Sequence, residues 1–372
     1  IRQLERRVAD NAEQYAKLVQ RQRQLRDQSI VEGPSSRLLY TAAAPERPSS
    51  LDPKFFILPA MILSMIAAGV LAIIRDKFDQ TLRSESQVQR AMGIPCVAMA
   101  PKLGWLTGRR PHEYLLTRPY SPYAEAIRAI VSSLQFGATP GQKTQVVQVS
   151  SSVRGEGKST LAASLAVYGT RLHDRVLLVD LDFRDPSLGK VLGLKPKSGV
   201  IDRMLFDKPL EEVVENIAGL GLDVLPMQAC PVDPVTLFST GSIDRLMEEL
   251  RKNYDFIVVD GPPLLGVTES GLISSLADKV VYAVKWGSTR RDVAINAVNE
   301  LRALGWTQQA ITQRFRAIVT QVDLKRHARY QYGDAVELYA RNRKYQYPNP
   351  SVRALSLPSR ADADVAHQTA AE

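Results

Sequence analysis

An uncharged stretch of twenty residues, from Phe55 to Ile74, constrains this chain more than any other feature of its sequence. A helix rises about 1.5 Å per residue, so a helix of this length spans a bilayer core of about 30 Å. A buried core helix is the alternative, but one this long usually has polar residues along one face. Basic residues follow the stretch closely and favour the cytoplasmic side: Arg75, Lys77, Arg83 and Arg90. We therefore predict a transmembrane helix over 55–75, with residues 1–54 outside the cytoplasm.

The region before this stretch divides into a charged helix and a proline-rich connector. Residues 1 to about 32 place apolar side chains at nearly three-and-four spacing, which predicts a helix with one apolar stripe: Ile1, Leu4, Val8, Tyr15 and Leu18. Such a stripe either packs on a partner helix or lies exposed on a solvated helix. Prolines then end the helix and exclude regular structure up to the uncharged stretch: Pro34, Pro45, Pro48 and Pro53.

The formal net charge is +9 over 372 residues, which favours anionic partners such as acidic lipid or phosphate-bearing ligands. No helix-turn-helix, zinc-finger or RNA-binding pattern accompanies this charge, so we expect no nucleic-acid partner. Cys96 and Cys230 are far apart in sequence and fit a reducing compartment. The four histidines lack ligand spacing, which argues against a histidine metal site.

After Ser121, short apolar runs alternate with helical patterns. Runs rich in Val, Leu and Ile predict strands buried on both faces, at 146–150, 176–180, 222–226, 256–260, 279–284 and 317–322. Their alternation with helices predicts a doubly wound, mostly parallel α/β sheet with helices on both faces. We assign 76–120 to a juxtamembrane linker, 121–325 to the α/β domain and 326–372 to a tail.

A glycine-rich turn follows the first of these strands. Residues 152–160, SVRGEGKST, match the phosphate-loop pattern G-x-x-x-x-G-K-[ST] except at the first position. Backbone N–H groups of such a loop, at a helix N-terminus, bind phosphate, which predicts ATP and Mg²⁺ as cofactors. We expect Lys158 to reach the β- and γ-phosphates and Ser159 to ligate Mg²⁺. The other predicted members of the nucleotide cradle are Ser152, Gly155, Glu156, Gly157 and Thr160.

Two later strands end in aspartates. Asp180 and Asp182 follow strand 176–180, and two carboxylates at this spacing point the same way. Ligands of open α/β sheets bind at the carboxyl ends of the strands, so these groups suit metal ligation or general-base work, although an aspartate that caps a helix is the simpler alternative. Asp260 ends strand 256–260 and is expected to hold Mg²⁺, often through water.

One loop position argues against a particular class of ATPase. Partition-type ATPases with a variant phosphate loop have a lysine directly after the first loop position, and this lysine reaches the phosphate of a partner subunit. Val153 occupies that position here. A sandwich-dimer ATPase is therefore disfavoured.

Tyrosines cluster near the C-terminus among basic residues, and they are Tyr330, Tyr332, Tyr339, Tyr345 and Tyr347. A core aromatic cluster would lie in apolar surroundings. This one is polar and terminal, which favours an exposed segment that can be modified, and nearby cations would stabilise added phosphate.

With these motifs, the chain resembles the bacterial tyrosine kinases of the exopolysaccharide co-polymerase family. The resemblance rests on the phosphate loop, on the motifs Asp180-Leu181-Asp182-Phe183-Arg184 and Asp260-Gly261-Pro262-Pro263, and on the terminal tyrosines. The prolines before the uncharged stretch also resemble that family's chain-length-determinant region. The segment 322–330 resembles the succinoglycan-type transport proteins.

The resemblance implies a first transmembrane helix and a periplasmic domain upstream of Ile1, and a bacterial inner-membrane location with residues 1–54 periplasmic and the kinase domain cytoplasmic. It implies ATP-dependent trans-autophosphorylation of the terminal tyrosines within a homo-oligomer. Lys158, Asp180, Asp182 and Arg184 become the candidate catalytic residues, and Ser159, Asp182 and Asp260 the candidate metal ligands. Either Asp180 or Asp182 would deprotonate the attacking tyrosine. The implied partners are the polysaccharide polymerase and export machinery and a phosphotyrosine phosphatase.

The chain departs from the family pattern in two places. The family's oligomerisation helix has a Glu and two Arg at three-residue spacing, of which Glu125 and Arg128 match but Val131 does not. Glu269 stands where the resemblance implies an aspartate. Two alternatives to a kinase stay open: a P-loop ATPase that moves a partner, and a structural polysaccharide co-polymerase without tyrosine kinase activity.

Overall fold

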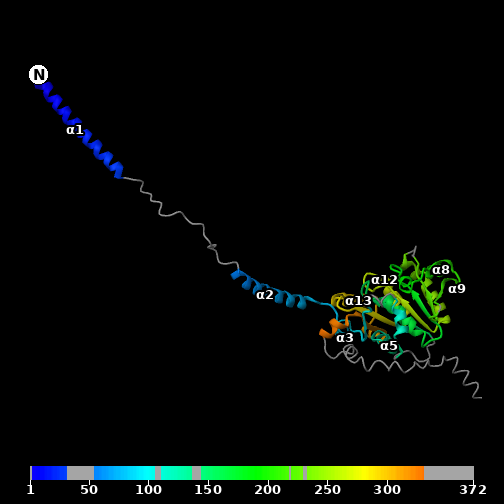
Figure 1. Ribbon diagram of the computed structural model, residues 1–372. Coiled ribbons are helices and arrows are strands. Elements are labelled where there is room, and N and C mark those ends of the chain that lie inside the picture. The colour runs from blue at the N-terminus through cyan, green and yellow to red at the C-terminus, as the bar shows by residue number, and fades with distance from the viewer. Residues whose placement is uncertain are drawn as a thin grey trace, which may run out of the picture. The chain divides into compact units, whose positions relative to one another are not determined.

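The computed structural model describes residues 2–31, 54–104, 110–135, 144–217, 219–228 and 233–330. The chain falls into two compact units, 1–76 and 77–372, and each is described on its own. The first unit contains helix α1 (Arg2–Val31) and all but the last two residues of helix α2 (Lys54–Phe78). The second contains all the strands among the described residues and the other helices (Figure 1).

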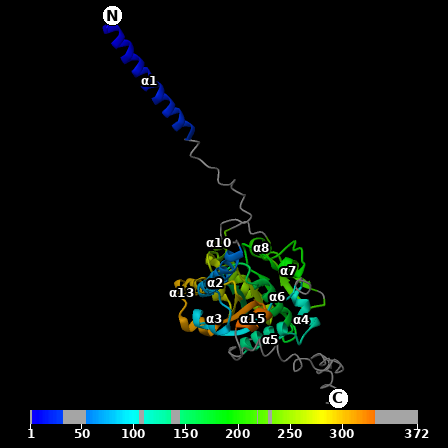
Figure 2. The same ribbon diagram turned by 60° about the vertical axis from the view of Figure 1, so that its left-hand side comes forward.

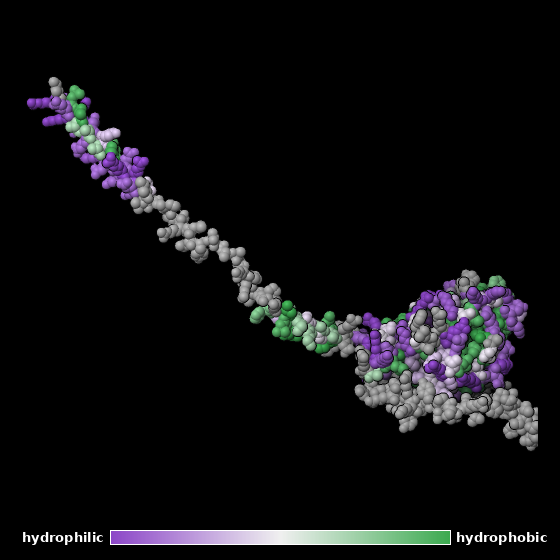
Figure 3. All heavy atoms as spheres, viewed as in Figure 1, coloured by the Kyte–Doolittle hydropathy of each residue, from purple (hydrophilic) through white to green (hydrophobic). Residues whose placement is uncertain are grey.

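Helix α2 has the length and composition of a membrane span. Its stretch Phe55–Ile74 has a mean hydropathy of 2.6, and none of that stretch is buried inside the protein. Apolar side chains cover most of the visible face of the helix (Figure 3). A soluble core helix would bury this surface, whereas α2 leaves it exposed, as a lipid-facing helix does. The described side chains of α1 are almost all exposed as well, including the stripe Leu4, Val8, Tyr15 and Leu18.

The second unit is built on an eight-stranded sheet. Its strands are β1 (Cys96–Pro101), β2 (Gln145–Ser151), β3 (Val176–Asp180), β4 (Glu215–Ile217), β5 (Leu222–Leu225), β6 (Phe256–Asp260), β7 (Lys279–Lys285) and β8 (Phe315–Val322). They lie in the order β1-β8-β7-β2-β6-β3-β5-β4. Every neighbouring pair is parallel except β4 and β5, which are antiparallel.

Helices cover both faces of this sheet (Figures 1 and 2). They are α3 (Glu85–Met92), α4 (Pro111–Thr117), α5 (Pro122–Gln135), α6 (Lys158–Gly169), α7 (Leu188–Leu192), α8 (Val200–Phe206), α9 (Leu210–Val213), α10 (Pro234–Ser239), α11 (Ser242–Asn253), α12 (Thr268–Leu276), α13 (Arg291–Ala303), α14 (Gln308–Arg314) and α15 (Leu324–Tyr330). The prediction of a doubly wound, mostly parallel α/β fold is confirmed.

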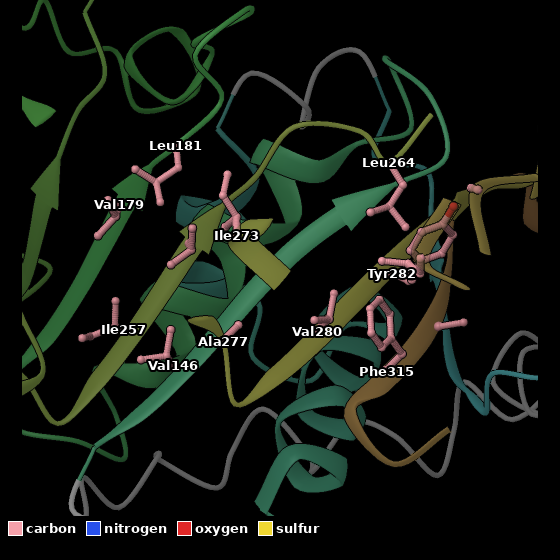
Figure 4. Close-up of a cluster of buried hydrophobic side chains, with 14 of the residues drawn as sticks. Val146, Val179, Leu181, Ile257, Leu264, Ile273, Ala277, Val280, Tyr282 and Phe315 are labelled. Carbon is pink, nitrogen blue, oxygen red and sulfur yellow. The ribbon is translucent and has the colours of Figure 1, made fainter. Parts of the chain in front are cut away.

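Two apolar clusters lie on opposite faces of the sheet because successive strand residues point to opposite sides. Val146, Val179 and Ile257 belong to one cluster, which packs under α11, α12 and α13 and is drawn in Figure 4. Their neighbours Val147 and Leu178 belong to the other, which packs under α5 and α6. Both faces of the central strands are therefore buried, as their apolar runs predict.

The assignment of 76–120 to a linker is wrong for most of that stretch. Residues 85–92 form α3, and 96–101 form β1, which pairs with β8. The folded unit thus begins at Lys77, well before residue 121. A short apolar strand bounded by prolines gives little local signal, and its partner lies more than two hundred residues later in the chain. The polar strand β4 was likewise absent from the predicted set.

Candidate nucleotide and magnesium site

The glycine-rich turn connects the end of β2 at Ser151 to the start of α6 at Lys158. Gly155 and Gly157 have φ of +85° and +93°, in the left-handed region that glycine adopts without strain. The turn therefore brings its backbone N–H groups to the N-terminus of α6, which is the geometry that binds phosphate.

A network of buried polar groups supports one side of this loop, and we call it the back of the phosphate loop. The carboxylate of Glu156 accepts hydrogen bonds from the Val153 N–H, at 3.0 Å, and from the Thr289 hydroxyl. Burial raises the pKa of Glu156, and these hydrogen bonds partly offset the rise. The Glu156 side chain thus braces the loop, so its part in the predicted cradle rests on its backbone N–H.

Strands β7 and β8 supply the rest of the back. Thr320 donates to the Glu156 carbonyl at 2.6 Å, and Gln321, at a φ of +55°, donates to the Gly155 carbonyl at 3.2 Å. The Tyr282 hydroxyl donates to the Ser152 hydroxyl at 2.8 Å. Tyr282 stands among the apolar residues of the same face (Figure 4). The serine that replaces the first glycine of the pattern is therefore a buried hydrogen-bonding residue.

Three buried aspartates line the opposite side, and with Lys158 they form what we call the carboxylate mouth. Asp180 and Asp260 are register partners on the neighbouring strands β3 and β6, and Asp182 follows in the turn after β3. Their exposed fractions are 1%, 0% and 3%. Asp180 accepts hydrogen bonds from the backbone N–H groups of Asp182 and Leu188, at 3.1 and 3.3 Å.

Burial raises the pKa of all three carboxyls. The pKa of Asp180 rises to about 7, mainly through desolvation and further through the charge of Asp182. The pKa of Asp260 rises well above its ordinary value through desolvation and the charge of Asp180, while Ser159 and Lys158 offset part of the rise. The mouth therefore groups three carboxyls whose ionised forms are poorly stabilised by their surroundings.

Lys158 lies inside this mouth. Its ammonium is 3.7 Å from the Asp182 carboxylate, and both side chains are nearly completely buried. The Ser159 hydroxyl, next in the chain, is hydrogen bonded to the Ser187 hydroxyl in the turn after β3. The first residues of α6 thus meet the acidic turn directly, as the combination of motifs predicts.

The residues of the mouth fit a divalent cation. Neither carboxylate oxygen of Asp260 has a hydrogen-bond partner among the described residues, although the side chain is fully buried. The described parts of the chain contain no cluster of three or more His, Cys, Asp or Glu that would hold a metal by itself. Mg²⁺ commonly binds through one or two carboxylates, water and substrate phosphates. The mouth therefore suits Mg²⁺ that arrives with a nucleotide better than a resident ion.

A pocket of about 200 Å³ adjoins the loop on the side of β1 and β8. Gly157, Thr160 and Leu161 line it from the phosphate loop and α6, and Thr320 and Gln321 line it from the end of β8. Thr160, a predicted member of the cradle, thus faces this hollow. The pocket therefore borders the loop backbone that the sequence predicts to bind phosphate.

Arg184 is fixed by an ion pair beside the mouth. Its guanidinium donates three hydrogen bonds, of 3.1 to 3.3 Å, to the carboxylate of Glu269 in α12. Glu269 is 1% exposed, whereas the Arg184 side chain is 58% exposed. A second arginine, Arg154 of the loop, pairs with Asp185 at 2.6 Å.

The side chains of the predicted phosphoacceptor tyrosines lie outside the part of the chain that the structure describes. Tyr330 ends α15, but its side chain lies outside the described residues. Tyr332, Tyr339, Tyr345 and Tyr347 lie outside the described residues altogether. Their role as acceptors remains a prediction.

Several supporting residues have no signal in the sequence pattern: Tyr282, Thr289, Thr320, Gln321 and Ser187. Glu269 stands out in the sequence only as a departure from the family pattern, with no partner indicated. Each of these residues pairs with a motif residue that is distant in the chain. The one available signal is position, because Thr320 and Gln321 lie toward the carboxyl end of strand β8. In a parallel sheet such ends meet at the ligand site.

Known proteins are similar to this chain in sequence and in fold. A family model described as an AAA domain matches residues 144–301. The tyrosine-protein kinase YwqD of Bacillus subtilis is 30% identical over 217 residues, which cover 58% of this chain and 89% of YwqD. The succinoglycan biosynthesis transport protein ExoP of Rhizobium meliloti is 23% identical over 381 residues, covering 94% of this chain and 47% of ExoP.

A solved structure, that of the chimerical protein CapA2B2, is 26% identical with a TM-score of 0.55, and the match covers 63% of this chain and 98% of that one. The chain spans less than half the length of the first curated relatives that it matches. The match to YwqD covers nearly all of that kinase, however. On this evidence the chain belongs to the family of bacterial tyrosine-protein kinases.

Proposed function

We propose that this chain is a membrane-anchored protein-tyrosine autokinase that uses ATP and Mg²⁺. One observation supports this function above the others: Lys158 and three buried, underneutralised carboxylates face one another at the end of a phosphate-binding loop. Phosphoryl transfer requires positioning and charge neutralisation, and this arrangement supplies groups for both.

In this proposal each residue of the mouth has a role. Lys158 leaves Asp182 and binds the β- and γ-phosphates, while Ser159, Asp182 and Asp260 hold Mg²⁺, which neutralises phosphate charge when it is bound. Asp180 accepts the tyrosine proton, because a pKa of about 7 suits a base at neutral pH. The phenolic oxygen bonds to the γ-phosphorus as the bond to the β-phosphate oxygen breaks, and ADP leaves.

The acceptor and the location belong to the same proposal. We assign the terminal tyrosines 330–347 of a neighbouring copy as acceptors, α2 as an inner-membrane span, residues 1–54 to the periplasm and the kinase domain to the cytoplasm. The likeness to ExoP, whose name denotes succinoglycan biosynthesis transport, supports a role in exopolysaccharide polymerisation, chain length and export. The proposed partners are further copies of this chain, the polymerase and export machinery, and a phosphotyrosine phosphatase.

The test uses the detergent-solubilised chain, ATP labelled at the γ-phosphate, and Mg²⁺. We expect label on tyrosine, and loss of at least a hundredfold in the Lys158→Met variant, because methionine keeps the stem but removes the charge that binds phosphate. The matched control is Lys190→Met, at an exposed lysine of α7, which should label normally. Phosphate release without phosphotyrosine would instead identify an ATPase. Nucleotide binding with neither product would identify a structural co-polymerase.

A further inference from the structure

The proposed magnesium site is assembled from two separate arms of the chain. One arm is the turn after β3, which contains Asp182, and the other is the end of β6, which contains Asp260. Within the sheet these arms are joined by the hydrogen bond from the Leu181 N–H to the Asp260 carbonyl, at 2.9 Å. Asp182 itself lies beyond the last residue of β3, so the sheet alone does not fix its position.

Outside the sheet, a second connection joins the same two arms. Arg184 lies two residues after Asp182, and its guanidinium forms an ion pair with Glu269 in the first turn of α12. That turn is itself held to the loop after Asp260, since the Ser270 hydroxyl donates to the Pro262 carbonyl at 2.8 Å. Arg184 and Glu269 therefore close a ring that runs from Asp182 through α12 to Asp260.

The chemistry of the pair between Arg184 and Glu269 suits a connection with a fixed geometry. A carboxylate that is 1% exposed is strongly disfavoured without a charged partner, and the described structure gives Glu269 the guanidinium of Arg184. Arginine presents its donors in a planar fork, so three hydrogen bonds hold the arginine's orientation as well as its distance. The exposed pair of Arg154 and Asp185 has one such bond and is a weaker connection.

We infer that Glu269 is a positioning residue for Mg²⁺: through Arg184 it holds the turn that contains Asp182 at the distance from Asp260 that one bound cation requires. This role rests on the proposed function for the site itself. Residues that orient metal ligands commonly change metal affinity by about 10- to 100-fold when they are replaced. The inference therefore predicts a defect in Mg²⁺ affinity and not a general loss of the nucleotide site.

The experiment measures binding of a fluorescent ATP analogue to the full chain in detergent, with Mg²⁺ titrated from zero. In Glu269→Gln we expect the Mg²⁺ midpoint to rise about tenfold or more, while binding in EDTA stays as in the wild type. Arg184→Lys keeps a positive charge opposite Glu269 but loses the fork, so its midpoint should rise by a smaller factor. The control is Glu249→Gln, which removes another Glu–Arg pair, with Arg203, between α8 and α11.

The outcomes separate this inference from its rivals. An unchanged Mg²⁺ midpoint in both variants overturns it, and so does an equal weakening of binding with Mg²⁺ and in EDTA, which would indicate a structural role only. If Glu269→Gln does not fold, Arg184→Lys alone decides by the same criterion. The comparison of Mg²⁺ midpoints does not depend on catalysis, because only binding is measured. An absence of phosphotyrosine would therefore refute the kinase proposal but not this inference.

Discussion

The back of the phosphate loop and the carboxylate mouth are both buried and polar, but they differ in how their charges are satisfied. On the back, Glu156 is held by Val153 and Thr289, and the loop carbonyls accept from Thr320 and Gln321. Burial raises the pKa of carboxyls on both sides, but in the mouth both oxygens of Asp260 lack partners among the described residues.

This difference indicates that the two sides have different roles, one in supporting the loop and one in binding. Buried polar groups that are satisfied make a structure rigid, whereas unsatisfied ones destabilise it unless something else binds them. We therefore expect the back to hold the shape of the loop whether or not nucleotide is bound. The mouth retains a strained arrangement that a cation and phosphates would relieve, which is characteristic of a binding site. The two sides should consequently respond to mutation in opposite ways.

The largest expected effect comes from Asp260→Asn, in the mouth. Asparagine keeps the shape of the side chain but removes an acid whose ionisation is opposed by burial, so near neutral pH the chain without nucleotide should unfold at a higher temperature than the wild type. The increase in affinity for a fluorescent ATP analogue that Mg²⁺ causes should be about a hundredfold smaller, because a proposed ligand is removed. In EDTA the same analogue should bind at least as well, since asparagine cannot ionise beside the phosphates. An Mg²⁺ enhancement equal to that of the wild type would contradict the assignment.

The pH dependence of stability gives the second test. The pKa of Asp180 is about 7 in the folded chain and 3.8 in its ordinary state. Between these values the folded chain binds more protons than the unfolded chain, so stability falls as the pH rises from about 4 to about 7, by up to about 1.4 kcal/mol per unit for this group. Denaturant titrations of the nucleotide-free chain should show this slope, and Asp180→Asn should reduce it. Asp244→Asn, at an exposed position of α11, is the control; a slope that Asp180→Asn leaves unchanged would contradict the prediction.

The two sides also differ in how far the sequence predicts them. The sequence identifies Lys158 by the phosphate-loop pattern. It identifies Asp180 and Asp260 because a buried apolar strand that ends in a charged residue is a strong local pattern, and β3 and β6 have the predicted bounds. Thr289 and Glu269 were not identified as partners. Their bonds join residues 133 and 85 positions apart, and an isolated threonine or glutamate has no pattern that specifies its partner.

The same reasoning explains the fold. Central strands are apolar on both faces and are recognisable one by one, whereas the edge strands β1 and β4 are defined mainly by the neighbour with which they pair. The motif residues of the mouth therefore follow from local sequence, but the supports of the loop follow from topology. The effects of mutations in the supporting residues can accordingly be predicted only with the structure.

The smallest expected effects come from two substitutions on the back of the loop, Thr289→Val and Tyr282→Phe. Valine has nearly the shape of threonine but cannot donate to Glu156, so a buried carboxylate loses one of its two named partners, at a cost of about 1–3 kcal/mol. The loop should be less well ordered, so the ATP analogue should bind about tenfold more weakly. The loss of affinity should be the same with Mg²⁺ and in EDTA, whereas the loss expected for Asp260→Asn depends on Mg²⁺. Tyr282→Phe, which removes only a neutral hydrogen bond to Ser152, should have a smaller effect of the same kind. A Thr289→Val defect confined to the Mg²⁺-dependent part of binding would show that back and mouth act as one unit.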